Sequence, residues 1–342
     1  MPLHLSILDQ SPIPEGLCAG DALRNSVDLA RLADGLGYTR YWVAEHHGTP
    51  ALACTSPEAL IGPIAAATSH LRVGSGGVML PHYSPLKVAE TFSMLSGLFP
   101  GRIDLGIGRA AGTSPNIALA LQRDRRHAPP GDFPEQLDEL LNYLANRTTP
   151  GSPFPRLAAS SIRFVSPEPW LLGSSEDSAS LASRIGLPYA FADFINPWGA
   201  SIARRYIEEF RPSEYLAAPR VAVAAWAVCA ESREEAQALS SSVRMMMTML
   251  LRGRLIAVPT VERAQRFLAE EGVPPETLPV GRRIIAGDPE TVRAELEELV
   301  RNYGAEELFV VNILHDHAAR RRSYELIAEA FGLSDLRTSD RR

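Results

Sequence analysis

Short apolar runs recur along the chain, and segments with helical periodicity separate them. This alternation is typical of repeated βα units that build a parallel sheet. The runs lack a polar face, as expected of strands that are covered on both sides. Eight such runs are present, and eight parallel strands close a (β/α)8 barrel. The runs are residues 3–8, 40–44, 71–80, 102–107, 169–173, 189–192, 220–228 and 307–313.

The segments between these runs place apolar residues at helical spacing. The segment 21–36 ends at Gly37, and the segment 56–68 opens with Ser56, Pro57 and Glu58, which together form a helix-start signal. The expected helices are residues 21–36, 56–68, 86–98, 133–144, 177–185, 200–210, 231–251 and 289–303. The sequence therefore predicts an α/β fold: one TIM-barrel domain over residues 1–342.

Three stretches interrupt this rhythm. Residues 111–132 follow the fourth strand, residues 148–167 precede the fifth, and residues 253–283 precede the eighth. Because long loops in compact domains tend to carry function, we expect the first two insertions to border a substrate site. The third is long enough to hold an additional helix.

Composition narrows the class of ligand. The chain has 34 basic and 40 acidic residues, a formal charge of −6, so it shows no basic patch for nucleic acid or for a membrane surface. No stretch approaches the roughly 20 apolar residues that a membrane-spanning helix needs. We therefore expect a cytoplasmic protein that acts on a small molecule. The cysteines, Cys18, Cys54 and Cys229, are far apart and indicate plain thiols.

The working end of a parallel barrel is the carboxyl edge of its strands, so residues directly after each run are the candidates. Glu45, His46 and His47 follow the second strand, where a carboxylate and two imidazoles can act as acid and base near neutral pH. The alternative is a surface turn. A zinc site is not indicated, because the spacing is not HExxH and no cysteine pair accompanies it. The same filter selects Asp9 with Gln10 and Asp193 with Phe194.

Small residues mark a second group of candidates. Gly76 and Gly77 lie inside an apolar strand, where glycine indicates a bulge or a ligand close to the backbone. Gly108 and Arg109 follow the fourth strand in a glycine-rich segment whose spacing is wrong for a dinucleotide fingerprint. A flat cofactor can lie against such a backbone while Arg109 binds a phosphate. Alternatively, Arg109 simply pairs with a neighbouring carboxylate.

Serines gather where the fifth strand meets the next helix. Ser174, Ser175 and Ser178 place hydroxyls beside the free backbone N–H groups of a helix N-terminus, which is an anion-binding arrangement. Ordinary helix capping is the alternative.

Three of these stretches together resemble the luciferase-like monooxygenase family. They are YWVAEHH at residues 41–47, RVGSGGVMLP at 72–81 and PGRIDLGIGR at 100–109. The resemblance implies a barrel that binds reduced FMN, supplied by a separate flavin reductase. It also implies dioxygen as co-substrate, which reacts by way of a flavin hydroperoxide to oxygenate a small organic substrate.

The resemblance also implies residue roles. His46 is the expected catalytic base, Glu45 a carboxylate of the flavin site, and the bond between Gly76 and Gly77 a cis peptide under the flavin ring. Arg109, Ser175 and Ser178 are expected to hold the phosphate. A second arginine is expected to come from Arg123, Arg125 or Arg126.

The chain departs from the luciferase catalytic subunit at two positions. A reactive cysteine of that subunit aligns with Gly108, and a tryptophan aligns near Asp193, so light emission and an aldehyde substrate are not supported. Similarity to oxidoreductases of actinomycete polyketide pathways suggests hydroxylation or epoxidation of a polyketide. The rival functions are deazaflavin-dependent hydride transfer on the same barrel and a non-catalytic flavin-binding protein. Family likeness further suggests a homodimer that pairs through the helix at residues 56–68.

Overall fold

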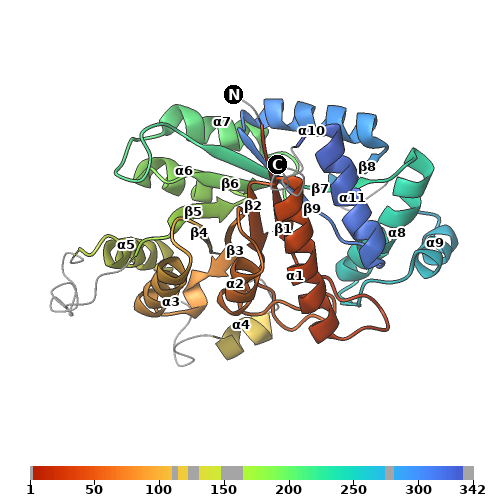
Figure 1. Cartoon of the computed structure of the whole chain (residues 1–342), viewed down its shortest axis with the longest axis horizontal. Coiled ribbons are helices and arrows are strands. Elements are labelled where there is room, and N and C mark those ends of the chain that lie inside the picture. Colours follow the sequence, from red (N-terminus) through yellow and green to blue (C-terminus); the bar gives the residue numbers. More distant parts are fainter. Residues whose placement is uncertain (1–2, 110–114, 122–130, 148–164, 274–280, 334–342) are drawn as a thin grey trace, which may run out of the picture.

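The computed structural model describes residues 3–109, 115–121, 131–147, 165–273 and 281–333. Eight parallel strands close a barrel at its centre, and helices surround it (Figure 1). Each strand pairs with the next one in the list below, and the last strand pairs with the first, which closes the barrel. The strands are β1 (His4–Asp9), β2 (Arg40–Val43), β3 (Arg72–Met79), β4 (Ile103–Gly108), β5 (Glu168–Gly173), β6 (Tyr189–Ala192), β7 (Val221–Cys229) and β9 (Glu307–Val311). The predicted (β/α)8 barrel is confirmed.

The helices that follow the strands cover the outside of the barrel (Figure 1). They are α1 (Ala19–Leu36), α2 (Pro57–Ala66), α3 (Pro85–Leu98), α5 (Phe133–Leu144), α6 (Glu176–Ile185), α7 (Ala200–Glu209), α8 (Arg233–Leu251), α10 (Pro289–Tyr303) and α11 (His317–Ala330). α11 was not among the expected helices, because its sequence is polar and rich in arginine, so the apolar residues on its buried face do not stand out. Within the described residues, no helix is long and apolar enough to cross a membrane.

Two of the interruptions hold further elements. α4 (Pro115–Leu121) lies in the stretch after β4, and α9 (Val261–Glu270) is the additional helix expected before the last barrel strand. Directly after this stretch lies a ninth strand that was not predicted from the sequence, β8 (Ile285–Gly287). β8 pairs only with the end of β7, outside the barrel. It was missed because a run of three residues shows no periodicity.

An ionic layer closes the amino-terminal end of the barrel. The buried guanidinium of Arg40 pairs with Asp104 at 2.8 Å, Glu307 at 3.1 Å and Glu168 at 3.1 Å. Above this layer the indoles of Trp42 and Trp170 donate to Asp104 and Glu168 at 2.8 and 3.0 Å. Since this end is filled, any ligand must enter from the carboxyl end of the strands.

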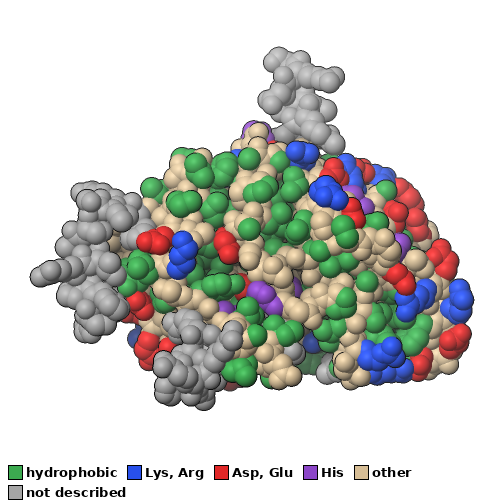
Figure 2. All heavy atoms as spheres, turned by 90° about the horizontal axis from the view of Figure 1, so that it is seen from below, with side chains coloured by type: hydrophobic (Ala, Val, Ile, Leu, Met, Phe, Trp, Pro, Cys, Tyr) green, Lys and Arg blue, Asp and Glu red, His purple; other side chains and the backbone are tan. Residues whose placement is uncertain are grey.

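The carboxyl end of the strands faces down in Figure 1 and toward the viewer in Figure 2. Hydrophobic and histidine side chains lie near the middle of this face, and many charged side chains gather toward its right-hand rim (Figure 2). Charged side chains are thus fewer in the middle of this face than at its right-hand rim (Figure 2).

Candidate functional site

An inner cavity of about 340 Å³ opens inside the carboxyl end of the barrel. Its floor is apolar: Trp42 and Phe309 lie with ring centroids 4.2 Å apart, and Leu8, Ala190 and Ala224 complete it. Of the predicted site residues, this cavity brings together the glycines, the serines and the arginine: Gly76, Gly77, Gly108, Arg109, Ser174, Ser175 and Ser178. Ligand cavities in proteins start at about this size and are mostly apolar with a few polar groups.

One wall of the inner cavity is bare backbone. The peptide bond between Gly76 and Gly77 is cis. A Cβ at Gly76 would lie 2.4 Å from Leu8 Cδ1, and a Cβ at Gly77 would lie 2.7 Å from the carbonyl oxygen of Gly106. A side chain at Gly77 would collide with backbone and one at Gly76 would have to displace Leu8, so the two glycines leave this wall bare and able to accept a planar ring at close approach.

The N-terminus of α6 forms the polar end of the inner cavity. Ser175 caps the helix, and its hydroxyl makes only long contacts, 3.3 and 3.4 Å, with Ser178 Oγ and Ser178 N. Ser178 Oγ is better satisfied, because it lies 2.8 Å from Tyr189 OH and donates to the carbonyl of Ser175 at 2.8 Å. The Ser175 hydroxyl and the backbone N–H groups of the first helical turn can therefore bind an anion.

Arg109 lies beside this helix end. Its side chain is 56% exposed and pairs with Asp177 at 3.5 Å. An exposed pair this long contributes about 0 to 1 kcal/mol, so an incoming anion can displace the carboxylate at little cost. The carboxylate partner considered from the sequence is therefore present, and Arg109 also lines the inner cavity together with the serines of α6, so its role as a phosphate ligand stays a prediction.

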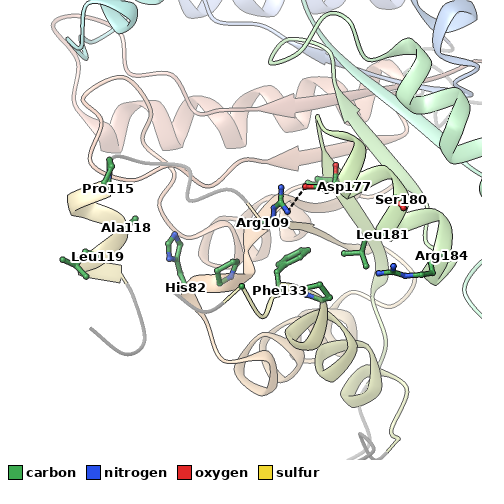
Figure 3. Close-up of a pocket in the computed structure, with 15 residues that line it drawn as sticks. His82, Arg109, Pro115, Ala118, Leu119, Phe133, Asp177, Ser180, Leu181 and Arg184 are labelled. Atoms are coloured by element: carbon green, nitrogen blue, oxygen red, sulfur yellow. Dashed lines mark hydrogen bonds and ion pairs between the residues drawn. The ribbon is translucent and has the colours of Figure 1, made fainter. Parts of the chain in front are cut away.

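An outer cavity of about 810 Å³ continues from this point and shares Arg109, Leu172 and Ser178 with the inner one. Figure 3 shows Ala118 and Leu119 of α4 on one side of it and Leu181 and Arg184 of α6 on the other. The inner cavity therefore leads past the polar end into a wider space. The arginines Arg123, Arg125 and Arg126, proposed as a second phosphate contact, lie outside the described residues.

Glu45 is a fully buried hydrogen-bond acceptor. Its Oε1 accepts from Tyr83 OH at 2.8 Å and lies 2.8 Å from His47 Nε2, and its Oε2 accepts from the backbone N–H of Met79 at 2.9 Å. These contacts tie the end of β2 to the end of β3. In the described part of the chain, the residues that line the two cavities do not include Glu45, His46 or His47.

His47 does not line the outer cavity itself but contacts His82, which does. The rings of His47 and His82 meet edge to face, with centroids 6.2 Å apart, and His82 lines the outer cavity. His82 was not identified from the sequence, because it lies in a short helical turn after β3 and not directly at a strand end. Phe194, selected from the sequence as a strand-end candidate, does line the inner cavity, whereas Trp42 and Leu172 of the same lining were not selected, because apolar barrel residues carry no local chemical signal.

His46 is largely buried, and its Nδ1 has no hydrogen-bond partner within the part of the chain that the structure describes. Burial, with the adjacent His47, lowers the pKa of His46 to about 4. Its imidazole is therefore neutral at physiological pH, and its Nδ1 can still bind a ligand. The predicted role of His46 as a base stays a prediction.

Two other candidates at strand ends have structural partners. Asp9 is fully buried against Arg320 at 2.7 Å and accepts from Tyr41 OH at 2.6 Å. Burial opposes its ionisation, but the Arg320 charge and these hydrogen bonds hold the pKa of Asp9 below its usual value. Asp193 accepts from Arg283 at 2.8 Å and from Tyr303 OH at 2.8 Å. Both aspartates join barrel strands to distant helices.

The model of the family described as luciferase-like monooxygenase matches residues 3–307. The chain is 44% identical to uncharacterized protein YwcH of Bacillus subtilis over 335 residues, 96% of this chain and 99% of the relative. It is 39% identical to the luciferase-like monooxygenase of Escherichia coli K12 over 332 residues, 95% of this chain and 96% of the relative. It is 37% identical to the N-acetyl-S-alkylcysteine monooxygenase of Bacillus subtilis over 330 residues, 96% of this chain and 98% of the relative.

Solved structures with the same fold also match the chain over nearly its whole length. The structure of apo-MsnO8 is similar with a TM-score of 0.87 and 41% identity, over 97% of this chain and 99% of that one. The FMN complex of the oxygenating constituent of 3,6-diketocamphane monooxygenase from Pseudomonas putida has a TM-score of 0.69 at 19% identity, over 96% of this chain and 98% of that one. An F420-dependent secondary alcohol dehydrogenase has a TM-score of 0.64 at 16% identity, over 97% of this chain and 99% of that one. These last two show the fold alone.

The family match, the full-length relatives and the shared barrel agree with one another. The chain belongs to the luciferase-like monooxygenase family and is an oxidoreductase.

Proposed function

We propose that the chain is an FMN-dependent monooxygenase that uses dioxygen to oxygenate a small organic substrate. The inner cavity carries this proposal, because an apolar space with a bare glycine wall ends at a cation, hydroxyls and a helix N-terminus. These two ends suit the two ends of FMN. The flat ring lies against Gly76 and Gly77, and the phosphate binds Arg109, Ser175 and the backbone N–H groups that open α6.

When bound, reduced FMN supplies the two electrons that the reaction needs. One oxygen atom of dioxygen enters the substrate, and the other leaves as water after taking up two protons. Bulk water cannot enter from the amino-terminal side, because that end of the barrel is filled by the ion pairs of Arg40 and the cavity floor is apolar. His46, which follows β2 and is neutral with its Nδ1 unpartnered among the described residues, is the group proposed to accept a proton beside the cavity.

The phosphate assignment is tested by comparing FMN with riboflavin, which lacks the phosphate. Arg109→Ala should weaken FMN binding by about tenfold or more, since a charge-assisted hydrogen bond contributes about 1.5–3 kcal/mol. Riboflavin binding should not change. Fluorescence titration gives both dissociation constants.

Arg184→Ala is the matched control, because this arginine also lines the outer cavity but lies on the last turn of α6. It should leave both affinities unchanged. If Arg109→Ala lowered FMN and riboflavin affinity equally, the phosphate would lie elsewhere.

A deazaflavin-dependent hydride transfer remains the second candidate. The outer cavity favours it in one respect, because it continues past the proposed phosphate position and leaves room for a cofactor with a longer tail. Incorporation of oxygen from ¹⁸O-labelled dioxygen into product separates the two functions, since only the monooxygenase incorporates the label.

Two classes of substrate follow from the relatives. A polyketide, hydroxylated or epoxidised, was suggested by the sequence. A match at 30% identity to 4-hydroxyprotoasukamycin monooxygenase of Streptomyces nodosus subsp. asukaensis, over 57% of this chain and 49% of the relative, gives it partial support. The full-length similarity to N-acetyl-S-alkylcysteine monooxygenase supports an N-acetyl-S-alkylcysteine more strongly. A separate reductase that supplies the reduced FMN belongs to the same proposal.

A further inference from the structure

Gly76 and Gly77 form a glycine wall that the strand pairing of the sheet supports only weakly. The pairing between β2 and β3 ends at Val43 and Ser75, one residue before this wall. The register between β3 and β4 is irregular between Ser75 and Val78, which are the residues on either side of the two glycines. The ladder therefore stops or is interrupted at the wall on both neighbouring strands, and the sheet alone fixes its position less firmly than elsewhere.

Glu45 continues the attachment of β3 to β2 beyond that point. It follows the end of β2 by two residues, and its side chain is fully buried. Its Oε2 accepts from the backbone N–H of Met79 at 2.9 Å. Met79 lines the inner cavity and comes two residues after Gly77. A side chain of β2 thus takes the place of the ladder partner that β3 lacks here.

The same carboxylate holds the chain a second time, four residues later. Glu45 Oε1 accepts from Tyr83 OH at 2.8 Å. We call residues 79–83 the linking segment, and Glu45 is bonded to both of its ends. Met79 at its start lines the inner cavity, and His82 near its end lines the outer cavity (Figure 3). The segment therefore forms the boundary that runs from one cavity to the other.

His47 adds a contact to the middle of this arrangement. Its Nε2 is 2.8 Å from Glu45 Oε1, and its ring meets His82 edge to face with centroids 6.2 Å apart. A carboxylate only accepts hydrogen bonds, so the bond to Glu45 holds the His47 ring with a proton on Nε2. The ring that packs against His82 is thus oriented by the same carboxylate.

We propose that Glu45 is a positioning residue, which clamps the linking segment and thereby sets the place of the glycine wall under the flavin ring. In the described part of the chain Glu45 lines neither cavity, whereas Met79 and His82, which it holds, line one each. A Cβ at Gly108 would lie 3.3 Å from Met79 Sδ, so a shift of Met79 also changes the gap between β3 and β4. This inference rests on the proposed function, because the flavin ring must lie on the glycine wall.

Titration with FMN and with riboflavin tests the proposal, because the two flavins share the ring. Glu45→Gln keeps the size of the side chain but replaces one accepting oxygen with an NH2 group. It should weaken the binding of both flavins by the same factor, about tenfold, as expected for loss of a charge-assisted hydrogen bond. Tyr83→Phe leaves the carboxylate in place and releases only the far end of the linking segment. It should weaken both flavins by about threefold.

Tyr143→Phe is the matched control, since Tyr143 OH also lies 2.8 Å from a glutamate oxygen, that of Glu139 on α5. It should leave both affinities unchanged. Weaker binding in Glu45→Gln with no change in Tyr83→Phe would show that Glu45 contacts the flavin directly and would overturn the proposal. A loss for FMN alone would overturn it too, because the effect would then lie at the phosphate. So would unchanged binding in both variants.

Amide hydrogen exchange on the flavin-free protein measures the clamp without the cofactor. The amide of Met79 should exchange about tenfold faster in Glu45→Gln, and the linking segment should also exchange faster in Tyr83→Phe. Tyr143→Phe should match the wild type. Equal exchange in all four proteins would overturn the clamp. Should Glu45→Gln not fold, Tyr83→Phe serves in both measurements.

Failure of the proposed function gives a different result, because the wild type would then bind neither flavin. The exchange measurement would still decide whether Glu45 holds the linking segment.

Discussion

His46 shows how burial sets the chemistry of one residue. Its unfolded pKa is about 6.5, and burial next to His47 lowers the folded value to about 4. Between these values the unfolded chain binds a proton that the folded chain does not. The free energy of unfolding must therefore fall as the pH drops from 6.5 toward 4.

His46→Asn should remove this contribution. The loss of unfolding free energy between pH 7 and pH 4.5 should be smaller in the variant by about 2 kcal/mol, as the difference between the two pKa values implies. Urea denaturation at the two pH values measures it. Identical pH dependence in wild type and variant would show that His46 titrates normally in the folded protein.

Gly106 shows that β3 and β4 pack too closely for a side chain between them. A Cβ at Gly106 of β4 would lie 2.1 Å from the carbonyl oxygen of Ser75 on β3, a backbone atom that cannot move away alone. Gly97, near the end of α3, has nothing within 4 Å of its hypothetical Cβ. The same substitution should therefore have opposite effects at the two positions.

Gly106→Ala should destabilise the protein by about 2 kcal/mol or more, since overpacking a close contact strains the neighbouring backbone. Gly97→Ala should be neutral or stabilising by up to about 1 kcal/mol, because alanine is the better helix former. Thermal and urea unfolding measure both. Tolerance of alanine at Gly106 would contradict the strand spacing described here.

At the level of elements, the sequence was sufficient for most of the barrel. The barrel strands were found as short apolar runs and all but one of the helices that follow them by their helical periodicity, and the signals at Gly37 and Ser56 mark helix ends correctly within a residue or so. β8 was missed because it has only three residues, and α11 was missed because its sequence is too polar to show an apolar face. Their role is nevertheless long-range, since α11 supplies Arg320 to Asp9.

The candidate site was less predictable than the fold. Choosing residues at the carboxyl ends of the strands correctly selected the glycines, the serines and Arg109, which line one cavity. They did not distinguish Asp9 and Asp193, whose partners are 311 and 90 residues away in sequence, from residues facing a ligand. Only the folded chain shows which side of the barrel wall a polar residue faces.

At the scale of the whole molecule, we propose a homodimer that includes α2 and the adjacent α3. Met94 and Leu98, one turn apart on α3, are 68% and 67% exposed. Neighbouring exposed apolar side chains of this size favour an interface. The mass in solution should then be twice the 37.2 kDa of the chain.

Leu98→Glu should shift the protein toward monomer in sedimentation equilibrium, because an interface of this kind does not accommodate an unpaired charge. Leu251→Glu is the control, since Leu251 is 58% exposed at the end of α8. Its variant should keep the wild-type mass. A wild type that stays monomeric at every concentration tested would end the proposal.

Anaerobic titration of the purified protein with reduced FMN, alongside a reduced deazaflavin of the F420 type, tests the central claim most directly. The account predicts saturable binding of reduced FMN that is tighter than binding of the deazaflavin. Tight binding of the deazaflavin with no binding of reduced FMN would contradict it and would assign the chain to hydride transfer.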